Sequence, residues 1–241
     1  MPVTLWHNGD AVRKLFLYIM MAYGILNTCR AQDTRFYLDA NIGPAFAANG
    51  FADHGAATEV GIVCNFSKYA GYGAMVRWQF NKMSAQSINN GLKQSSLPVA
   101  WDVQAKNWES ESFMIGSDNT FPFSPKTGRW SLRVRMMLGA TVTLFPGVDA
   151  HAQSDQETYH YVQNSISALS MSCLFGAGIQ WKVGKKLYLT LDGSYFGTNP
   201  TFKNVQTFVS SGTRDLIASY TTNFSEDIRS LTAGVGIRLA L

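Results

Sequence analysis

The chain has 241 residues, of which 15% are charged and 46% hydrophobic, and its mean hydropathy is −0.04. An ordinary soluble domain carries about 25% charged residues, so this chain has little charge with which to cover a surface. The formal net charge of +4 is scattered along the sequence and predicts no nucleic-acid partner. No segment reaches the roughly 18 to 20 continuous apolar residues of a membrane helix. A soluble β-protein and a membrane barrel remain.

The first segment, residues 1–31, has the pattern of a secretory signal peptide. Two basic residues precede the apolar run 15–26, and a polar stretch ending in Ala31 follows it. The run is too short to span a bilayer comfortably. We expect cleavage after Ala31, which makes Gln32 the mature N-terminus and residues 32–241 a single exported domain.

From residue 34 onward the hydrophobic pattern has a period of two, which predicts strands. In the segment 130–145 every second residue from Trp130 to Leu144 is apolar, and most residues between them are polar, charged or glycine. Such runs are longer than ordinary soluble strands and suit a tilted membrane crossing of about ten residues. The eight expected strands are 34–46, 57–67, 72–83, 111–123, 129–145, 167–182, 187–197 and 228–240.

Short and long connections alternate between these strands. Short turns follow the second, fourth and sixth strands, while long polar segments occupy residues 84–110, 146–165 and 198–227. Short periplasmic turns and long external loops are typical of outer-membrane barrels. The sequence therefore predicts an all-β fold, an eight-stranded antiparallel up-and-down transmembrane β-barrel in the outer membrane of a Gram-negative bacterium.

Alternation alone does not say which face is inside, and a soluble lipocalin-like barrel is the main structural rival. Two observations favour lipid outside. The polar face is mostly small and uncharged, which suits a lumen better than a water-exposed surface. Aromatic residues also gather beside the short turns, as an interfacial girdle requires. These are Phe66, Tyr69, Tyr72, Phe121, Phe123, Trp130 and Trp181, with Trp78, Phe80, Phe145 and Tyr195 as the expected opposite girdle.

The polar face carries charges of both signs, which should pair because an unpaired buried charge is costly. An eight-stranded barrel is only wide enough for side chains to fill it. We therefore expect a salt-bridge network that plugs the lumen, and a narrow pore is the alternative. The expected members are Asp39, Glu59, Arg77, Asp118, Arg133, Arg135, Lys182, Asp192 and Arg238.

The three cysteines cannot form a disulfide framework. Residues 26–29 resemble a lipoprotein cleavage box ending in Cys29, but the residues before the cysteine are bulkier than that box prefers, so we favour its removal with the signal peptide. Cys64 and Cys173 fall on the outward face, four strands apart, beyond disulfide distance.

The polar connections contain the only candidates for catalysis or metal binding. His151 and His160 lie in the segment 146–165, close in sequence to Asp149 and other polar residues. A polar loop brings such residues together by chance, and the spacing of the histidines matches no familiar ligand pattern. We expect no catalytic residue, no metal site and no cofactor.

Three local patterns resemble a known family. They are Arg129 to Arg135 after the turn Pro125-Lys126-Thr127-Gly128, Gly176 to Trp181 before Gly184-Lys185-Lys186, and the closing segment Ala233 to Leu239. Together they resemble the outer membrane protein β-barrel domain family, the eight-stranded OmpA/OmpX type that includes PorT-like proteins. The resemblance implies insertion by the barrel-assembly machinery and no agreed activity.

The sequence favours a non-enzymatic outer-membrane barrel with a structural or surface-interaction role through its long external loops. The alternatives are a narrow pore for ions or small solutes and a lipid-modifying barrel enzyme that uses His151 or His160. We expect outer-membrane lipids as surroundings, a monomer, and an external partner that the sequence does not identify.

Overall fold

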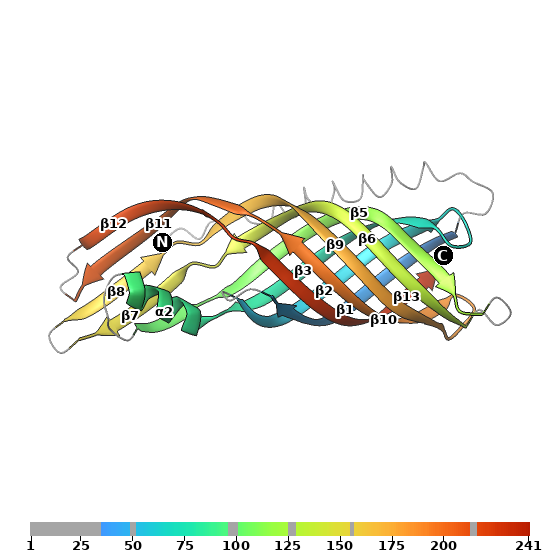
Figure 1. Cartoon of the computed structure of the whole chain (residues 1–241), viewed down its shortest axis with the longest axis horizontal. Helices are drawn as coiled ribbons and strands as arrows, with labels where there is room; N and C mark the ends of the chain where they lie inside the picture. Colours follow the sequence, from blue (N-terminus) through green and yellow to red (C-terminus); the bar gives the residue numbers. More distant parts are fainter. Residues whose placement is uncertain (1–34, 49–51, 96–100, 125–128, 155–156, 213–215) are drawn as a thin grey trace, which may run out of the picture.

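The computed structural model describes residues 35–48, 52–95, 101–124, 129–154, 157–212 and 216–241. The expected signal peptide and Cys29 lie outside the described residues. Within the described residues no helix is long and apolar enough to cross a membrane. The molecule is elongated, with a strand barrel at the end that carries the C-terminus and a second sheet beyond the other end of the barrel (Figure 1).

Eight antiparallel strands close into a barrel in the order β1-β13-β10-β9-β6-β5-β3-β2. Closure is made by β1 and β13, which place Asp39 opposite Arg238. The predicted eight-stranded antiparallel barrel is confirmed, and the largest boundary differences are earlier starts for β2 and β5. The barrel strands are β1 (Arg35–Ala47), β2 (Ala52–Asn65), β3 (Gly71–Met83), β5 (Asn107–Pro122), β6 (Trp130–Phe145), β9 (Ile166–Lys182), β10 (Leu187–Thr198) and β13 (Ile228–Ala240).

The long connections are not the irregular polar loops that the sequence predicts. They form a five-stranded antiparallel sheet in the order β12-β11-β8-β7-β4, which we call the extension. Only Pro146 and Gly147 separate β6 from β7, so the barrel strand continues almost directly into the extension. The added elements are α2 (Ala85–Ser95), β4 (Trp101–Ala105), β7 (Val148–Gln153), β8 (Thr158–Gln163), β11 (Thr201–Ser211) and β12 (Leu216–Ser225).

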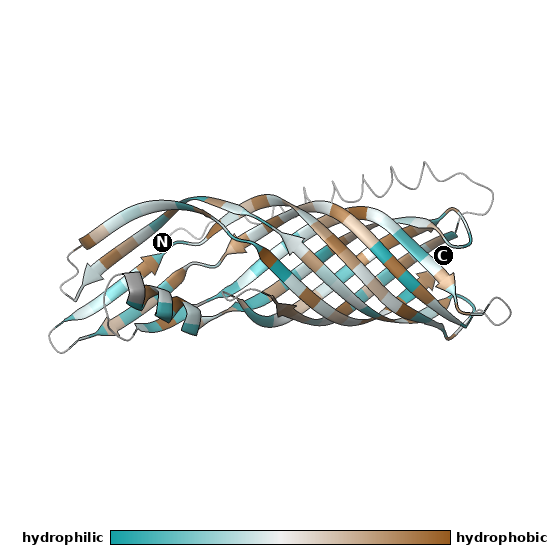
Figure 2. Ribbon diagram, viewed as in Figure 1, coloured by the Kyte–Doolittle hydropathy of each residue, from teal (hydrophilic) through white to brown (hydrophobic). Residues whose placement is uncertain are grey.

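The outer face of the barrel is a continuous apolar band. The alternating hydropathy is visible on the crossing strands (Figure 2) because successive side chains point to opposite faces of a strand. Large apolar side chains on this face are exposed although the polar side chains between them are buried, the inverse of a soluble barrel. They include Leu38, Ile42, Val60, Ile115, Met136, Leu138, Leu169, Met171, Phe175, Leu191, Leu231, Val235 and Ile237.

The extension has its own hydrophobic core at the mouth of the barrel. Ile88 and Leu92 of α2 pack there with Trp108, Phe145 and Phe202. The expected role of Phe145 in an outer girdle is wrong, because its side chain is 4% exposed and belongs to this core. On β6 the side chain of Phe145 points to the same side as those of the buried Thr141 and Thr143. It therefore points inward, away from lipid.

Candidate functional site

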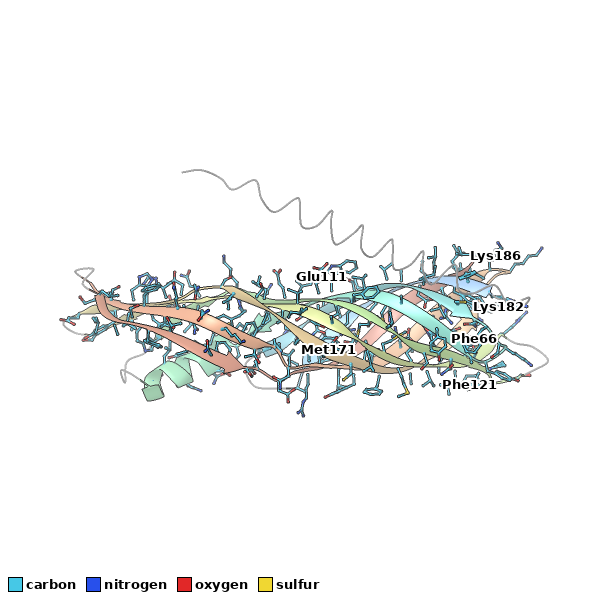
Figure 3. All side chains as sticks on the ribbon, turned by 90° about the horizontal axis from the view of Figure 1, so that it is seen from above. Phe66, Glu111, Phe121, Met171, Lys182 and Lys186 are labelled. Carbon is cyan, nitrogen blue, oxygen red and sulfur yellow. The ribbon has the colours of Figure 1, made fainter. Side chains whose placement is uncertain are left out.

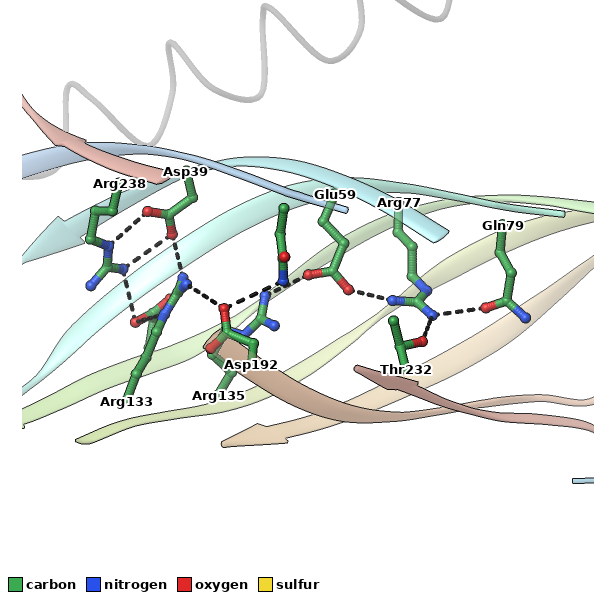
Figure 4. A network of polar contacts seen from close by, with 11 residues as sticks. Asp39, Glu59, Arg77, Gln79, Arg133, Arg135, Asp192, Thr232 and Arg238 are labelled. Carbon is green, nitrogen blue, oxygen red and sulfur yellow. Dashed lines mark hydrogen bonds and ion pairs between the residues drawn. The ribbon is translucent and has the colours of Figure 1, made fainter. Parts of the chain in front are cut away.

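The lumen holds a buried network of ion pairs, which begins at Arg133 on β6 (Figure 4). Arg133 Nε donates to both carboxylate oxygens of Asp118, at 3.0 and 3.1 Å, and the guanidinium also pairs with Asp39. Its Nη1 lies 3.7 Å from Asp192 Oδ2. Arg238 donates to Asp39 Oδ1 at 2.7 Å and to Asp118 Oδ1 at 3.0 Å. Two arginines from different strands therefore share the same two carboxylates.

A second group continues the network along the barrel axis (Figure 4). Glu59 accepts hydrogen bonds from Arg135 Nη1, at 2.8 Å, and from Arg77 Nη1. Arg77 Nη2 also donates to Gln79 Oε1 and Thr232 Oγ1, both at 2.8 Å. This group joins strands on both sides of the β1–β13 closure and so ties opposite walls of the barrel together.

These contacts leave little free space in the lumen. Four arginines face four carboxylates in the two groups, so their formal charges cancel. A cavity of about 20 Å³ remains between Glu59, Arg133 and their neighbours, enough for about one water molecule. An apolar layer adjoins the network, and Arg77 lies over the ring of Phe196 at 5.1 Å. This layer consists of Met75, Met114, Met137, Leu174 and Phe196.

Lys182 differs from the other expected members of the network. It is exposed at the end of β9, and its Nζ lies 5.8 Å from the ring centroid of Tyr188. Figure 3 shows Lys182 near Lys186 at the end of the barrel that carries the short turns. The alternation places Lys182 on the inward side, as expected, but it is the last residue of β9, at the rim of the barrel, where its side chain is exposed. It is therefore not part of the buried network.

The expected aromatic residues beside the short turns lie on the outer surface in stacked pairs. Phe66 and Phe121 are labelled at this end of the molecule in Figure 3. The ring centroids of Trp130 and Trp181 are 5.5 Å apart with an interplanar angle of 10°. The other stacked pairs are Phe66 with Tyr72 and Tyr69 with Phe121, and Phe123 is exposed nearby.

The expected opposite margin of the band is less aromatic. Trp78 and Tyr195 are half-buried on the outer face, and Trp78 Nε1 donates to Glu111 Oε1 at 3.3 Å. Figure 3 shows Glu111 and Met171 near mid-length, far from the short turns. The apolar band therefore occupies the barrel half of the molecule and ends where the extension begins.

Cys64 and Cys173 are not joined by a disulfide, as expected. Cys173 is half-buried, whereas Cys64 is buried at 2% exposure. Cys64 therefore does not present its thiol to lipid, contrary to the expectation.

An apolar pocket lies at the junction of barrel and extension, and sequence analysis missed it. It has a volume of about 300 Å³ and is bounded by α2 on one side and by Trp108, Tyr161 and Phe224 on others. Burial, and then the neighbouring Tyr220, raises the pKa of Tyr161 to about 12, so this hydroxyl stays protonated. The helical spacing of Ile88 and Leu92 was the available signal for this element.

One edge of the extension is formed by β12, which pairs with β11 on one side only. Most of its side chains are exposed on both faces, including the large apolar residues Leu216, Ile217 and Tyr220. An exposed apolar edge strand is a template for pairing with another chain, and natural proteins usually protect such an edge. This edge has no charged residue along Leu216–Ser225.

Comparison with known proteins finds likeness only at the level of architecture. No protein-family model matches the chain, and no curated protein matches it. Neisserial surface protein A (NspA) is 13% identical, with 85% of this chain and 96% of that chain covered and a TM-score of 0.40. A major outer membrane protein from Thermus thermophilus is 8% identical, with 87% and 100% covered and a TM-score of 0.46. Ail, the attachment invasion locus protein of Yersinia pestis, is 12% identical, with 86% and 97% covered and a TM-score of 0.38.

The exposed apolar band around a closed barrel with a polar, ion-paired lumen decides the class of protein. The chain is an outer-membrane β-barrel. Only a closed barrel lets strands cross lipid with every backbone group paired, and only lipid makes an outer apolar face favourable. The soluble lipocalin-like alternative requires the opposite orientation of the two faces.

Proposed function

We propose that this chain is a non-conducting, non-enzymatic outer-membrane barrel that binds a polypeptide partner through the external extension. The observation that carries the proposal is the uncharged, exposed edge strand β12, held beyond the apolar band by a folded sheet. An extended segment of the partner would add to this edge as a further strand. Backbone hydrogen bonds would supply affinity, and Leu216, Ile217 and Tyr220 would supply apolar contacts.

The filled lumen supports this proposal over the pore alternative. The cavity beside Arg133 is about 20 Å³, and two arginines that would line a pore are each held by buried carboxylates. The lipid-modifying alternative is not favoured, because His151 and His160 lie on β7 and β8 of the extension, beyond the apolar band. We further propose that the aromatic pairs beside the short turns mark a membrane interface, and that the chain is inserted by the barrel-assembly machinery as a monomer.

Crosslinking from β12 in intact cells tests the partner-binding proposal. A photoreactive benzoylphenylalanine in place of Tyr220 is expected to give one discrete adduct with a polypeptide on illumination. Leu216→Lys with Ile217→Lys is expected to reduce that adduct by roughly tenfold, because charges on an edge strand oppose strand addition. Gln153→Lys adds a charge at an exposed position on β7 and should leave the adduct unchanged.

Two kinds of result would contradict these proposals. An absent adduct, or one that the two lysines do not reduce, would refute binding at β12. Discrete single-channel currents from the purified protein in planar bilayers would refute the non-conducting barrel and support the pore.

The apolar pocket favours a second candidate function, the capture of a small apolar molecule at the barrel mouth. Its volume is at the lower end for ligand sites, which are usually roughly 300–1,000 Å³ and mostly apolar. Glu226 on its rim has a pKa raised by burial and then by the charge of Asp227.

Gly91 provides a test of this pocket. A Cβ added to Gly91 meets nothing within 4 Å, and the residue lines the pocket from α2. With the methionine methyl groups labelled for NMR, toluene is expected to shift the Met83 signal saturably and leave Met75 in the lumen unmoved. Gly91→Leu should abolish the shift by filling the space, whereas Gly91→Ala should preserve it and stabilise α2 by about 0.5–1 kcal/mol. A Met83 response that survives Gly91→Leu would count against the pocket.

A further inference from the structure

Three potential metal ligands come together on the extension, although the sequence spacing predicts no site. His151 on β7 and His160 on β8 are directly opposite in the antiparallel register. Asp149 precedes His151 by two residues, so strand alternation places both side chains on the same face. One ligand atom from each of Asp149, His151 and His160 lies within 4.8 Å of the other two.

The contacts within this cluster point the same atoms toward one another. Asp149 Oδ1 lies 2.8 Å from His160 Nε2 and 3.2 Å from His151 Nε2. The two imidazole rings are stacked, with centroids 4.2 Å apart and an interplanar angle of 11°. A single carboxylate oxygen thus faces two imidazole nitrogens, an arrangement in which a cation between the three groups is favoured.

The cluster is accessible to an ion from outside the membrane. The side chains of Asp149, His151 and His160 are 49%, 48% and 38% exposed, so the rings can rotate to aim both Nε2 lone pairs at one point. Asp102 on β4 is the register partner of His151 on its other side and is also exposed. It adds negative charge beside the same part of the sheet.

We propose that Asp149, His151 and His160 form a binding site for a divalent transition-metal ion, with Zn²⁺ as the preferred occupant. Two imidazoles and one carboxylate suit Zn²⁺, with nitrogen ligands at about 2.0–2.1 Å and a fourth position open to water or to a ligand from a partner. Mg²⁺ and Ca²⁺ prefer sets made only of oxygen ligands and are disfavoured here. The bound ion bridges β7 and β8 and thereby fixes the hairpin that they form.

Zinc binding by the full-length folded barrel in detergent, prepared without a histidine tag, tests the site. Calorimetric titration is expected to give one Zn²⁺ per chain, and Co²⁺ in its place should give visible absorption bands of a tetrahedral site. His151→Ala and His160→Ala should each weaken binding by roughly tenfold or more, because each removes one of three protein ligands. Asp149→Asn should weaken it as well.

His54→Ala is the matched control, since His54 is exposed on β2 and lies on a different sheet. It should leave both the stoichiometry and the affinity unchanged. The different mobility of unboiled and boiled samples on gels reports that each variant has folded. Absence of stoichiometric binding in the parent protein would overturn the site. So would Zn²⁺ binding by folded His151→Ala and His160→Ala that is as tight as in the parent protein. Neither result depends on whether β12 binds a partner.

Discussion

Replacing Arg133 with alanine is expected to lower the free energy of unfolding of the barrel by about 3–5 kcal/mol. Arg133 is 3% exposed and faces three carboxylates, of which Asp118 and Asp192 are also buried. Its removal leaves these charges with too few partners, and the cavity beside them is only about 20 Å³. Unfolding by guanidinium chloride in phospholipid vesicles, followed by tryptophan fluorescence, measures the loss.

Arg229→Ala is the matched control for that substitution. Arg229 pairs with Asp227 at the start of β13, but their side chains are 54% and 50% exposed, so water can replace the lost partner. The expected cost is much smaller than that of Arg133→Ala, because exposed ion pairs contribute little to stability. Arg133→Lys should fall between the two, because lysine keeps the charge but lacks the planar fork that spans two carboxylates. Equal costs for Arg133→Ala and Arg229→Ala would show that the lumen network does not stabilise the barrel.

The barrel was predictable because each strand separates lipid from lumen. That separation imposes a period of two over more than ten residues, as in β6, where Met136 and Leu138 face out and Arg135 and Met137 face in. The same alternation identified Arg77, Arg133 and Arg238 as inward residues before any pairing was known. Which carboxylate each arginine contacts depends on strand order and barrel stagger, which a single sequence does not specify.

The position of a side chain along the barrel axis was harder to predict than whether it faces the lumen or the lipid. Lys182 has the correct inward parity but lies at the last residue of β9, where it is exposed at the rim of the barrel. Phe145 has inward parity as well, and only the fold shows that it packs in the core of the extension. A period of two reports the direction of a side chain and carries no information about its depth in the membrane.

The edge strand β12 was missed because it lacks the alternation of the barrel strands. In β12 almost every side chain is exposed on both faces, so apolar and polar residues do not alternate along it. The neighbours Leu216 and Ile217 are both apolar, and the neighbours Thr221 and Thr222 are both polar. Asp149 and His160 were considered as candidates and set aside, because their spacing in the sequence did not predict that they meet. These residues are separated by ten others in the sequence, and only the register of the β7–β8 pair brings them together.

The close packing of β5 against β6 gives a second large expected effect, at Gly139. A Cβ added to Gly139 would stand 2.0 Å from the carbonyl oxygen of Phe113 and 2.8 Å from Cα of Met114. Both atoms belong to the backbone of the neighbouring strand, so no side-chain rotation can relieve the overlap. Gly139→Ala is therefore expected to cost about 1–3 kcal/mol or more in the same unfolding measurement.

Gly193→Ala separates this steric effect from a general effect of alanine in the barrel. Gly193 lies on barrel strand β10, and its added Cβ would meet only the carbonyl oxygen of Ala177, at an ordinary 3.8 Å. The expected change is within about 0.5 kcal/mol, in the direction of stabilisation, because alanine restricts the unfolded chain more than glycine does. If Gly139→Ala proved as mild as Gly193→Ala, the two strands would have to be farther apart at Gly139 than described. The close approach of β5 and β6 would then not explain how eight strands enclose so narrow a lumen.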